Sequence, residues 1–172
     1  MMHYAPLPQA CSTIERENML LNDSGGQYLE GTTDTTRTFA VGPITDEERR
    51  DFTNALKGVI ALSRQRFLAG STGSDLDTIC RGQIWKEGLN YRCGTGHSVS
   101  FVGNVHEGPH ALNSRNTTRM RPGMVVTDEP GVYETDLVGI RIENELVCVH
   151  KADNQYGTFL GFEPLMLSLI HI

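Results

Sequence analysis

The chain has 172 residues, enough for one domain with a hydrophobic core and short for two. Its net charge of −6 comes from 15 basic and 21 acidic residues with no block of Lys or Arg, which argues against a nucleic-acid surface or an anionic membrane patch. No apolar run approaches the ~18 residues of a membrane-spanning helix, and the opening residues lack the features of a signal peptide. We therefore expect a cytoplasmic protein.

The four cysteines, Cys11, Cys80, Cys93 and Cys148, are widely spaced. None forms the close pair that is typical of a zinc knuckle or a redox site, so reduced thiols are the favoured interpretation. Two disulfides are the alternative.

The first part of the chain predicts a hairpin. Residues 1 to about 18 carry little periodicity and are expected to be extended. Residues 19–29 and 32–41 are predicted strands joined by a turn at Glu30-Gly31, and β-branched Thr dominates the second.

Two helices are predicted next. Residues 45–67 begin with a capping box formed by Thr45 and Glu48. The second helix covers Ser74 to about Lys86, with Gly88 at its C-terminal end. The expected inward faces are Phe52, Leu56, Val59, Ile60 and Phe67 on the first helix and Leu76, Ile79, Cys80 and Ile84 on the second.

The remainder of the chain predicts β structure, interrupted by Pro-Gly breaks at 122–123 and 130–131. The expected strands lie around 99–101 and at 124–127, 139–149 and 158–165.

Two aspartates stand on the predicted first hairpin. Asp23 precedes Ser-Gly-Gly, where an aspartate usually accepts backbone hydrogen bonds in a turn. Asp34 lies inside the Thr-rich strand, where an acid does not favour packing, and Arg37 faces the opposite side.

Two glutamates form a second pair of acids later in the chain, with a sequence spacing similar to that of the two aspartates. Asp23 and Asp34 are 11 residues apart, and Glu129 and Glu143 are 14 apart, as if two hairpins each offered two inward acids. The alternative for Glu143 is a solvated sheet face, which it would share with Arg141 and Glu145.

Two histidines lie in glycine-containing turns. His97 in GTGHSVS and His106 in NVHEGPH can each be a satisfied core histidine or a functional group, and Glu107 is a further candidate. The glycine-rich stretches at 70–75 and 93–98 do not match a phosphate-binding loop, because neither has the required lysine or strand-to-helix context.

Taken together, five residues supply an oxygen-rich donor set with one imidazole, which suits a pair of divalent cations. They are Asp23, Asp34, His97, Glu129 and Glu143.

At this point the motifs carry a resemblance. The segments HYAP, DSGGQYLEGTTDTTRT, GTGHSVSFVGNVHEGP, TDEPGVYE and GIRIENE, in this order, closely resemble the catalytic domain of the Xaa-Pro aminopeptidases (aminopeptidase P). These enzymes are pita-bread metallopeptidases, together with methionine aminopeptidase, prolidase and creatinase. The resemblance implies an α+β fold, in incomplete form, with a curved, mostly antiparallel sheet backed by helices.

The resemblance also implies residue roles. Asp23 would bind one metal, Asp34 and Glu143 would bridge both, and His97 and Glu129 would complete the second. The further implied roles are substrate contact for His106, a proline pocket lined by His3, and orientation of the ligands by Arg141.

The implied activity is hydrolysis of the bond between an N-terminal residue and a following proline, by a hydroxide bridging two divalent metals. Ligand type favours Mn²⁺, with Zn²⁺, Co²⁺ and Fe²⁺ as alternatives. Glu129 is the expected proton shuttle, and His97 and His106 complete the catalytic set. The expected partners are peptides with proline at position two, with neither nucleic acid nor membrane, and a homodimeric full-length parent.

Two features depart from the family pattern. Ser98 and Ser100 stand where family members often have glycine, which could narrow the approach beside His97. The resemblance covers residues 1 to about 166 and then stops, so we expect a partial catalytic domain over 1–166 and a non-native tail over 167–172.

Two other functions fit parts of this pattern. A prolidase-like dipeptidase belongs to the same family, and some pita-bread proteins are non-catalytic interaction modules that have lost ligands or gained basic extensions. The intact donor set and the acidic charge favour the peptidase.

Overall fold

The computed structural model of the chain describes residues 5–166. His3 and the expected tail at 167–172 lie outside the described residues. The predictions for both therefore stay predictions.

The predicted N-terminal hairpin is confirmed. Strand β1 (Met19–Tyr28) pairs antiparallel with β2 (Gly31–Ala40), and a two-residue turn joins them. Along β2, Asp34, Thr36 and Thr38 are buried while their neighbours are more exposed. A strand alternates its side chains between two faces, so this one turns an acid and two hydroxyls towards the interior.

The two predicted helices are confirmed, with two corrections to the first. Helix α1 (Asp46–Ser63) starts at the capping box of Thr45 and Glu48, and α2 covers Gly73–Trp85. The predicted extension of the first helix to Phe67 is wrong, because the chain leaves the helix and forms β3 (Arg66–Leu68), which pairs with a C-terminal strand. Phe67 is still buried, whereas Ile60 is 43% exposed and does not belong to the inward face.

The C-terminal half forms antiparallel pairs within the described residues. The largest sheet has the order β3-β10-β9-β6, and the other pairs are β4-β5 and β7-β8. The strands are β4 (Gly96–His97), β5 (Ala111–Leu112), β6 (Val125–Asp128), β7 (Gly131–Glu134), β8 (Val138–Arg141), β9 (Asn144–Asn154) and β10 (Gly157–Pro164).

Two strand predictions need correction. Residues 99–101 form no strand; the short strand β4 ends just before them, at His97. The predicted strand at 139–149 is interrupted at Ile142-Glu143, and its halves pair with different partners, β8 with β7 and β9 with β6 and β10. This interruption places Glu143 at a junction between two sheets.

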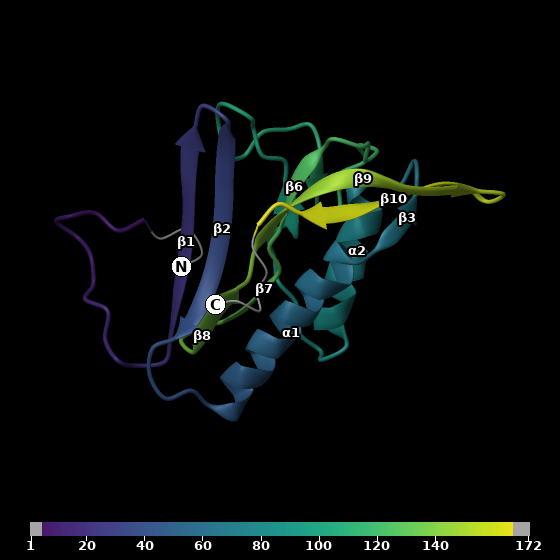
Figure 1. Cartoon of the computed structure of the whole chain (residues 1–172). Coiled ribbons are helices and arrows are strands. Elements are labelled where there is room, and N and C mark those ends of the chain that lie inside the picture. Colours follow the sequence, from purple (N-terminus) through teal and green to yellow (C-terminus); the bar gives the residue numbers. More distant parts are fainter. Residues whose placement is uncertain (1–4, 167–172) are drawn as a thin grey trace.

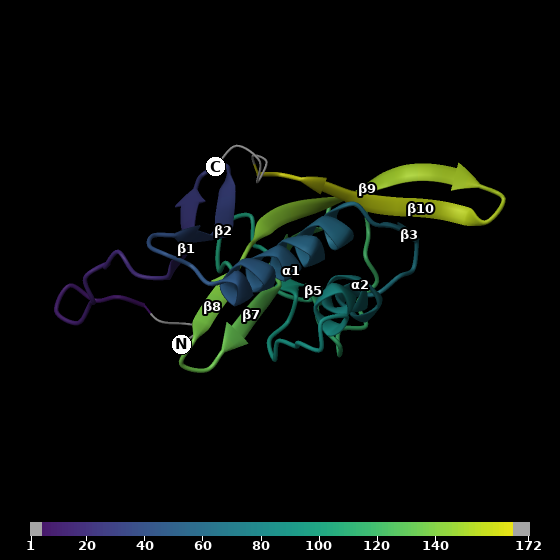
Figure 2. The same cartoon turned by 90° about the horizontal axis from the view of Figure 1, so that it is seen from below.

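The helices pack together on one side of the strands, as Figures 1 and 2 show. The β1–β2 hairpin stands at one end of the molecule, and the long β9–β10 hairpin extends from the other. The main core joins α1, α2 and the largest sheet through Leu62, Leu76, Cys80, Val126 and Leu146. Neither helix in the described part is long and apolar enough to cross a membrane.

Candidate metal centre

The structure brings the five predicted donor residues together. Asp23 lies on β1, Asp34 on β2, His97 on β4, Glu129 just after β6, and Glu143 between β8 and β9. All except Glu143 line a cavity of about 440 Å³, whose other lining residues are Gly25, Gly26, Gln27, Thr32, Thr33, Cys93, Val105, His106, Tyr133 and Arg141.

The donor atoms form two groups that share one residue. One oxygen or nitrogen from each of His97, Glu129 and Glu143 lies within 4.8 Å of the others, and the same holds for Asp23, Asp34 and Glu143. A third group joins Asp34 and His97 to the exposed His106. Two triplets with a common carboxylate have the spacing needed to hold two neighbouring cations.

The hairpin register aligns the two aspartates. Asp23 stands opposite Thr36, and Asp34 stands opposite Gly25, so both acids lie on one face of the β1–β2 ladder. A side chain at Gly25 would place its Cβ 2.4 Å from the carbonyl oxygen of Thr33. Glycine there lets the hairpin close beside Asp34.

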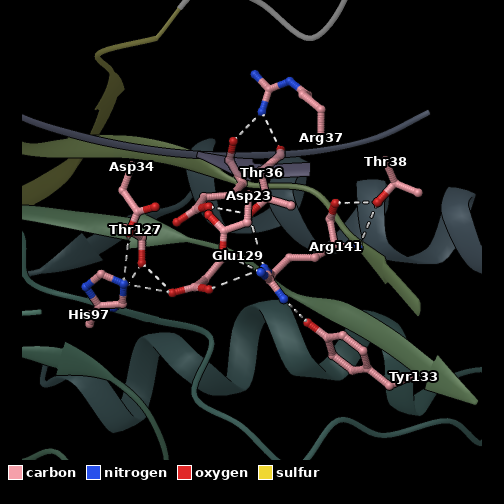
Figure 3. A network of polar contacts seen from close by, with 11 residues as sticks. Asp23, Asp34, Thr36, Arg37, Thr38, His97, Thr127, Glu129, Tyr133 and Arg141 are labelled. Carbon is pink, nitrogen blue, oxygen red and sulfur yellow. Dashed lines mark hydrogen bonds and ion pairs between the residues drawn. The ribbon is translucent and has the colours of Figure 1, made fainter. Parts of the chain in front are cut away.

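His97 connects the two halves of the site (Figure 3). Its Nε2 lies 3.3 Å from Asp34 Oδ2 and 3.1 Å from Glu129 Oε1. Its Nδ1 lies 3.1 Å from the carbonyl oxygen of Ser98, which can only accept a hydrogen bond, so Nδ1 carries the proton. This leaves Nε2 directed at the carboxylates as a cation ligand once it is deprotonated.

The backbone of His97 is held against β6. Its N–H donates to Thr127 Oγ1 at 3.0 Å, and this hydroxyl donates to Glu129 Oε1 at 2.9 Å. A Cβ on Gly96 would lie 1.9 Å from the Thr127 carbonyl oxygen, so only glycine allows β4 to approach β6 this closely.

Glu143 is buried, which contradicts the alternative of a solvated sheet face. Glu143 is 1% exposed and its neighbours Arg141 and Glu145 are 4% exposed. Thr36 Oγ1 donates to Glu143 Oε2 at 2.6 Å, whereas Oε1 has no hydrogen-bond partner among the described residues. Burial, followed by the charges of Glu129 and Asp34, raises the pKa of Glu143 to about 8.

Arg141 holds several site residues at once, as the resemblance implies. It donates to Asp23 Oδ2 at 2.5 Å through Nη2 and to Tyr133 Oη at 3.0 Å through Nη1, and its Nε lies 3.7 Å from Glu129 Oε2. The planar guanidinium with its five fixed donors suits this task. Arg141 therefore contacts one carboxylate from each of the two groups, Asp23 and Glu129.

Several supporting residues were not predicted. Arg37 donates through Nη1 to the carbonyl oxygens of Thr36 and Glu143, and its Nη2 donates to Asn144 at 3.0 Å. The hydroxyl of Thr38 bonds with both backbone groups of Arg141. A period-two alternation of Asp34, Thr36 and Thr38 was present in the sequence and could have indicated this polar face.

The electrostatics of the site fit divalent cations. Burial lowers the pKa of His97, but hydrogen bonds to Asp34, Glu129 and Ser98 outweigh this effect and raise the pKa to about 10. A protonated His97 thus supplies one positive charge between carboxylates, while Glu143 keeps a buried oxygen without a partner in residues 5–166. Two divalent cations would supply the missing positive charge, and the free oxygen of Glu143 could bind one of them. The donor set therefore fits a pair of divalent cations.

Comparison with known proteins identifies the family of this chain. The model of metallopeptidase family M24 matches residues 1–150. The "Probable Xaa-Pro aminopeptidase P" of Laccaria bicolor is 46% identical over 176 aligned residues, covering 99% of this chain and 27% of that protein. The chain thus spans about a quarter of the length of this relative.

Solved structures share the fold. X-prolyl aminopeptidase from Caenorhabditis elegans, described as a cytosolic enzyme with a di-nuclear active site, has a TM-score of 0.88 and 40% identity, covering 96% of this chain and 27% of that one. Prolidase from Pyrococcus furiosus has a TM-score of 0.78 and 28% identity, covering 94% of this chain and 46% of the prolidase chain.

The fold and the family match place this chain in a class of metallopeptidase-related proteins. The chain belongs to metallopeptidase family M24. The expected pita-bread fold and family membership are both confirmed.

Proposed function

We propose that this chain supplies the catalytic site of a metal-dependent Xaa-Pro aminopeptidase. The observation that carries this proposal is the convergence of the five donors into two triplets that share Glu143. The similarity to relatives named Xaa-Pro aminopeptidase supports it. The intact, converging donor set also argues against a non-catalytic interaction module.

The proposed ligands are the predicted ones. Asp23, Asp34 and Glu143 would hold one ion, and His97, Glu129 and Glu143 the other, with Asp34 close enough to His97 to reach both. The oxygen-rich set favours Mn²⁺, with Zn²⁺, Co²⁺ and Fe²⁺ as alternatives. When bound, such cations would lower the pKa of a water and polarise the scissile carbonyl.

The proton transfers are assigned to the side chains. Glu129 takes a proton from the attacking water as the oxygen of that water adds to the scissile carbonyl carbon. Glu129 then gives the proton to the proline nitrogen as the C–N bond breaks. Glu129 suits this role because its two oxygens contact different partners, His97 and Arg141. His106 is proposed to contact the substrate, because its exposed ring lines the same cavity and its centroid lies 3.8 Å from that of His97.

The proline requirement follows from the leaving group. The nitrogen of an Xaa-Pro bond carries no hydrogen, so ordinary amide recognition does not apply, and a pocket shaped for the ring supplies the specificity. His3 is proposed to line this pocket. A homodimeric parent, cytoplasmic location and the division into 1–166 and 167–172 likewise stay predictions.

The test is hydrolysis of an Xaa-Pro-Pro peptide by the full-length protein with added Mn²⁺. Replacing Asp34 with Asn keeps its size and removes its charge, and should lower kcat/KM at least 100-fold. The matched control is Asp46→Asn, an exposed residue in the first turn of α1, which should leave the rate within about twofold. Equal rates for the Asp34→Asn variant and the wild type would rule out the proposed mechanism.

The similarity to a prolidase favours one second candidate, an Xaa-Pro dipeptidase. The two activities differ in substrate length. Faster cleavage of Xaa-Pro-Pro than of the dipeptide Xaa-Pro supports the aminopeptidase, whereas cleavage of the dipeptide alone supports the dipeptidase.

A further inference from the structure

A second polar cluster, outside the donor set, joins α2 to the segment that precedes β4. It consists of Asp77, Arg81, Tyr91 and Thr95, which are 1%, 8%, 2% and 0% exposed. We call these four residues the buried clamp.

An ion pair forms the centre of the buried clamp. Arg81 donates to both carboxylate oxygens of Asp77, through Nε at 2.9 Å and Nη2 at 2.8 Å. The same guanidinium lies 4.0 Å from the centre of the Tyr91 ring and donates to the carbonyl oxygens of Tyr91 at 2.6 Å and Cys93 at 3.0 Å. The helix thereby holds the loop that precedes β4.

Thr95 connects this loop to the candidate metal centre. Its hydroxyl donates to Asp77 Oδ1 at 2.6 Å and lies 2.5 Å from Tyr91 Oη. Its carbonyl oxygen accepts the backbone N–H of Glu129 at 2.7 Å. His97 follows two residues later, so two proposed ligands, His97 and Glu129, depend on the placement of Thr95.

Stability alone does not account for this arrangement. Burying a paired arginine and aspartate costs desolvation that their attraction only roughly offsets, and apolar replacements of similar volume are often as stable. The many directed bonds from Arg81 and Asp77 to the 91–95 segment instead restrict where that segment can lie.

We propose that the buried clamp positions His97 and Glu129 and thereby sets the affinity of the cation they hold with Glu143. This inference rests on the metal binding that the proposed function assigns to the site, not on the proposed peptidase activity. The group formed by Asp23, Asp34 and Glu143 takes two of its three ligands from the β1–β2 hairpin, which bears no clamp residue. Loss of the clamp should therefore weaken one cation site and spare the other.

The experiment measures Mn²⁺ binding to the metal-free full-length protein by isothermal titration calorimetry. Thr95→Val keeps the shape of the side chain and removes its hydrogen bond to Asp77. Arg81→Lys keeps the charge and removes the bidentate hydrogen bonding to the Asp77 carboxylate. Thr95→Ser retains the hydroxyl and is the conservative rescue.

The wild-type protein should bind two ions. Thr95→Val and Arg81→Lys should weaken one of them 10- to 100-fold, the range expected for residues that orient ligands, and leave the other within about twofold. Thr95→Ser should bind both ions as the wild type does.

Leu76→Ala is the control for a purely structural effect. Leu76 precedes Asp77 on α2 and is 1% exposed, so this variant should lower the urea midpoint while leaving both Mn²⁺ affinities within about twofold. The inference is overturned if Leu76→Ala also weakens one ion selectively, if Thr95→Val weakens both ions equally, or if Thr95→Val weakens neither.

The same titration separates this inference from the proposed function. Two bound ions without cleavage of any Xaa-Pro peptide would remove the proposed function and leave the clamp inference intact. Absence of Mn²⁺ binding by the wild-type protein would overturn both.

Discussion

At the scale of single residues, the candidate centre concentrates negative charge that the protein alone does not neutralise. Glu143 belongs to both cation groups, is 1% exposed and has one oxygen without a partner among the described residues. A residue in this position favours cation binding at the expense of the stability of the metal-free protein.

Replacing Glu143 with Gln should therefore have opposite effects on stability and binding. The neutral amide can still accept from Thr36, and it avoids a buried negative charge. Burial, followed by the charges of Glu129 and Asp34, disfavours that charge and raises the pKa of Glu143 to about 8. At pH 9 we expect the free energy of unfolding of the metal-free variant, measured by urea unfolding, to exceed that of the wild type by about 1–3 kcal/mol. We expect its affinity for Mn²⁺ to fall more than 100-fold. Lower stability of the variant at pH 9 would contradict the role assigned to this charge.

Arg141 offers a second test at this scale. Arg141→Lys keeps the positive charge, but a lysine ammonium group cannot contact Asp23, Tyr133 and the Glu129 carboxylate at the same time. We expect kcat/KM for Xaa-Pro-Pro to fall 10- to 100-fold. Tyr133→Phe removes one of these bonds and is the matched comparison; an equal loss in both variants would show that Tyr133, rather than the guanidinium as a whole, is decisive.

At the scale of secondary-structure elements, close backbone approaches place the ligands. β4 contains only Gly96 and His97, and it lies against β6 because Gly96 has no side chain. Short strands of this kind have little stability of their own, so their position depends on the elements that enclose them.

Gly96→Ala should displace β4 from β6. The new Cβ would lie 1.9 Å from the Thr127 carbonyl oxygen, so the strand must move and take His97 with it. We expect loss of activity and at least tenfold weaker Mn²⁺ binding. Gly82→Ala in α2, where a Cβ meets open space, is the control and should stabilise the protein by about 0.5–1 kcal/mol without changing Mn²⁺ affinity, as measured by urea unfolding and calorimetry.

At the scale of the whole molecule, the proposed cations would compete with protons for the same residues. Burial and neighbouring carboxylates raise the pKa of Glu143 from 4.5 to about 8, and hydrogen bonds to carboxylates outweigh burial and raise the pKa of His97 from 6.5 to about 10. In both cases the folded metal-free protein binds the proton more tightly than the unfolded chain does. Stability from both groups is therefore lost as pH rises, between about 4.5 and 8 for Glu143 and between 6.5 and 10 for His97.

We expect the metal-free protein to lose on the order of a few kcal/mol of unfolding free energy between pH 5.5 and 8.5, measured by urea unfolding in EDTA. With excess Mn²⁺ the stabilisation by metal should increase over the same range, because the ligands must be deprotonated to bind. Metal-free stability that rises with pH would contradict the assigned pKa shifts.

Much of this protein was determined by its local sequence. The capping box of Thr45 and Glu48 specified where α1 begins, and the turn before Gly31 specified the hairpin that carries Asp23 and Asp34. The types and order of the motifs identified the family and nominated all five donors. These features depend on neighbouring residues and on chemical type, which a single sequence displays directly.

Tertiary structure alone decided the rest. The end of α1 before β3 and the interruption at Glu143 follow from pairing with distant strands. The burial of Arg141, Glu143 and Glu145 depends on β2 covering a face whose sequence is that of a solvated strand. The alternation of polar and apolar residues along a strand does not indicate which distant element covers each face. Only the assembled fold therefore reveals that these charges converge on one site.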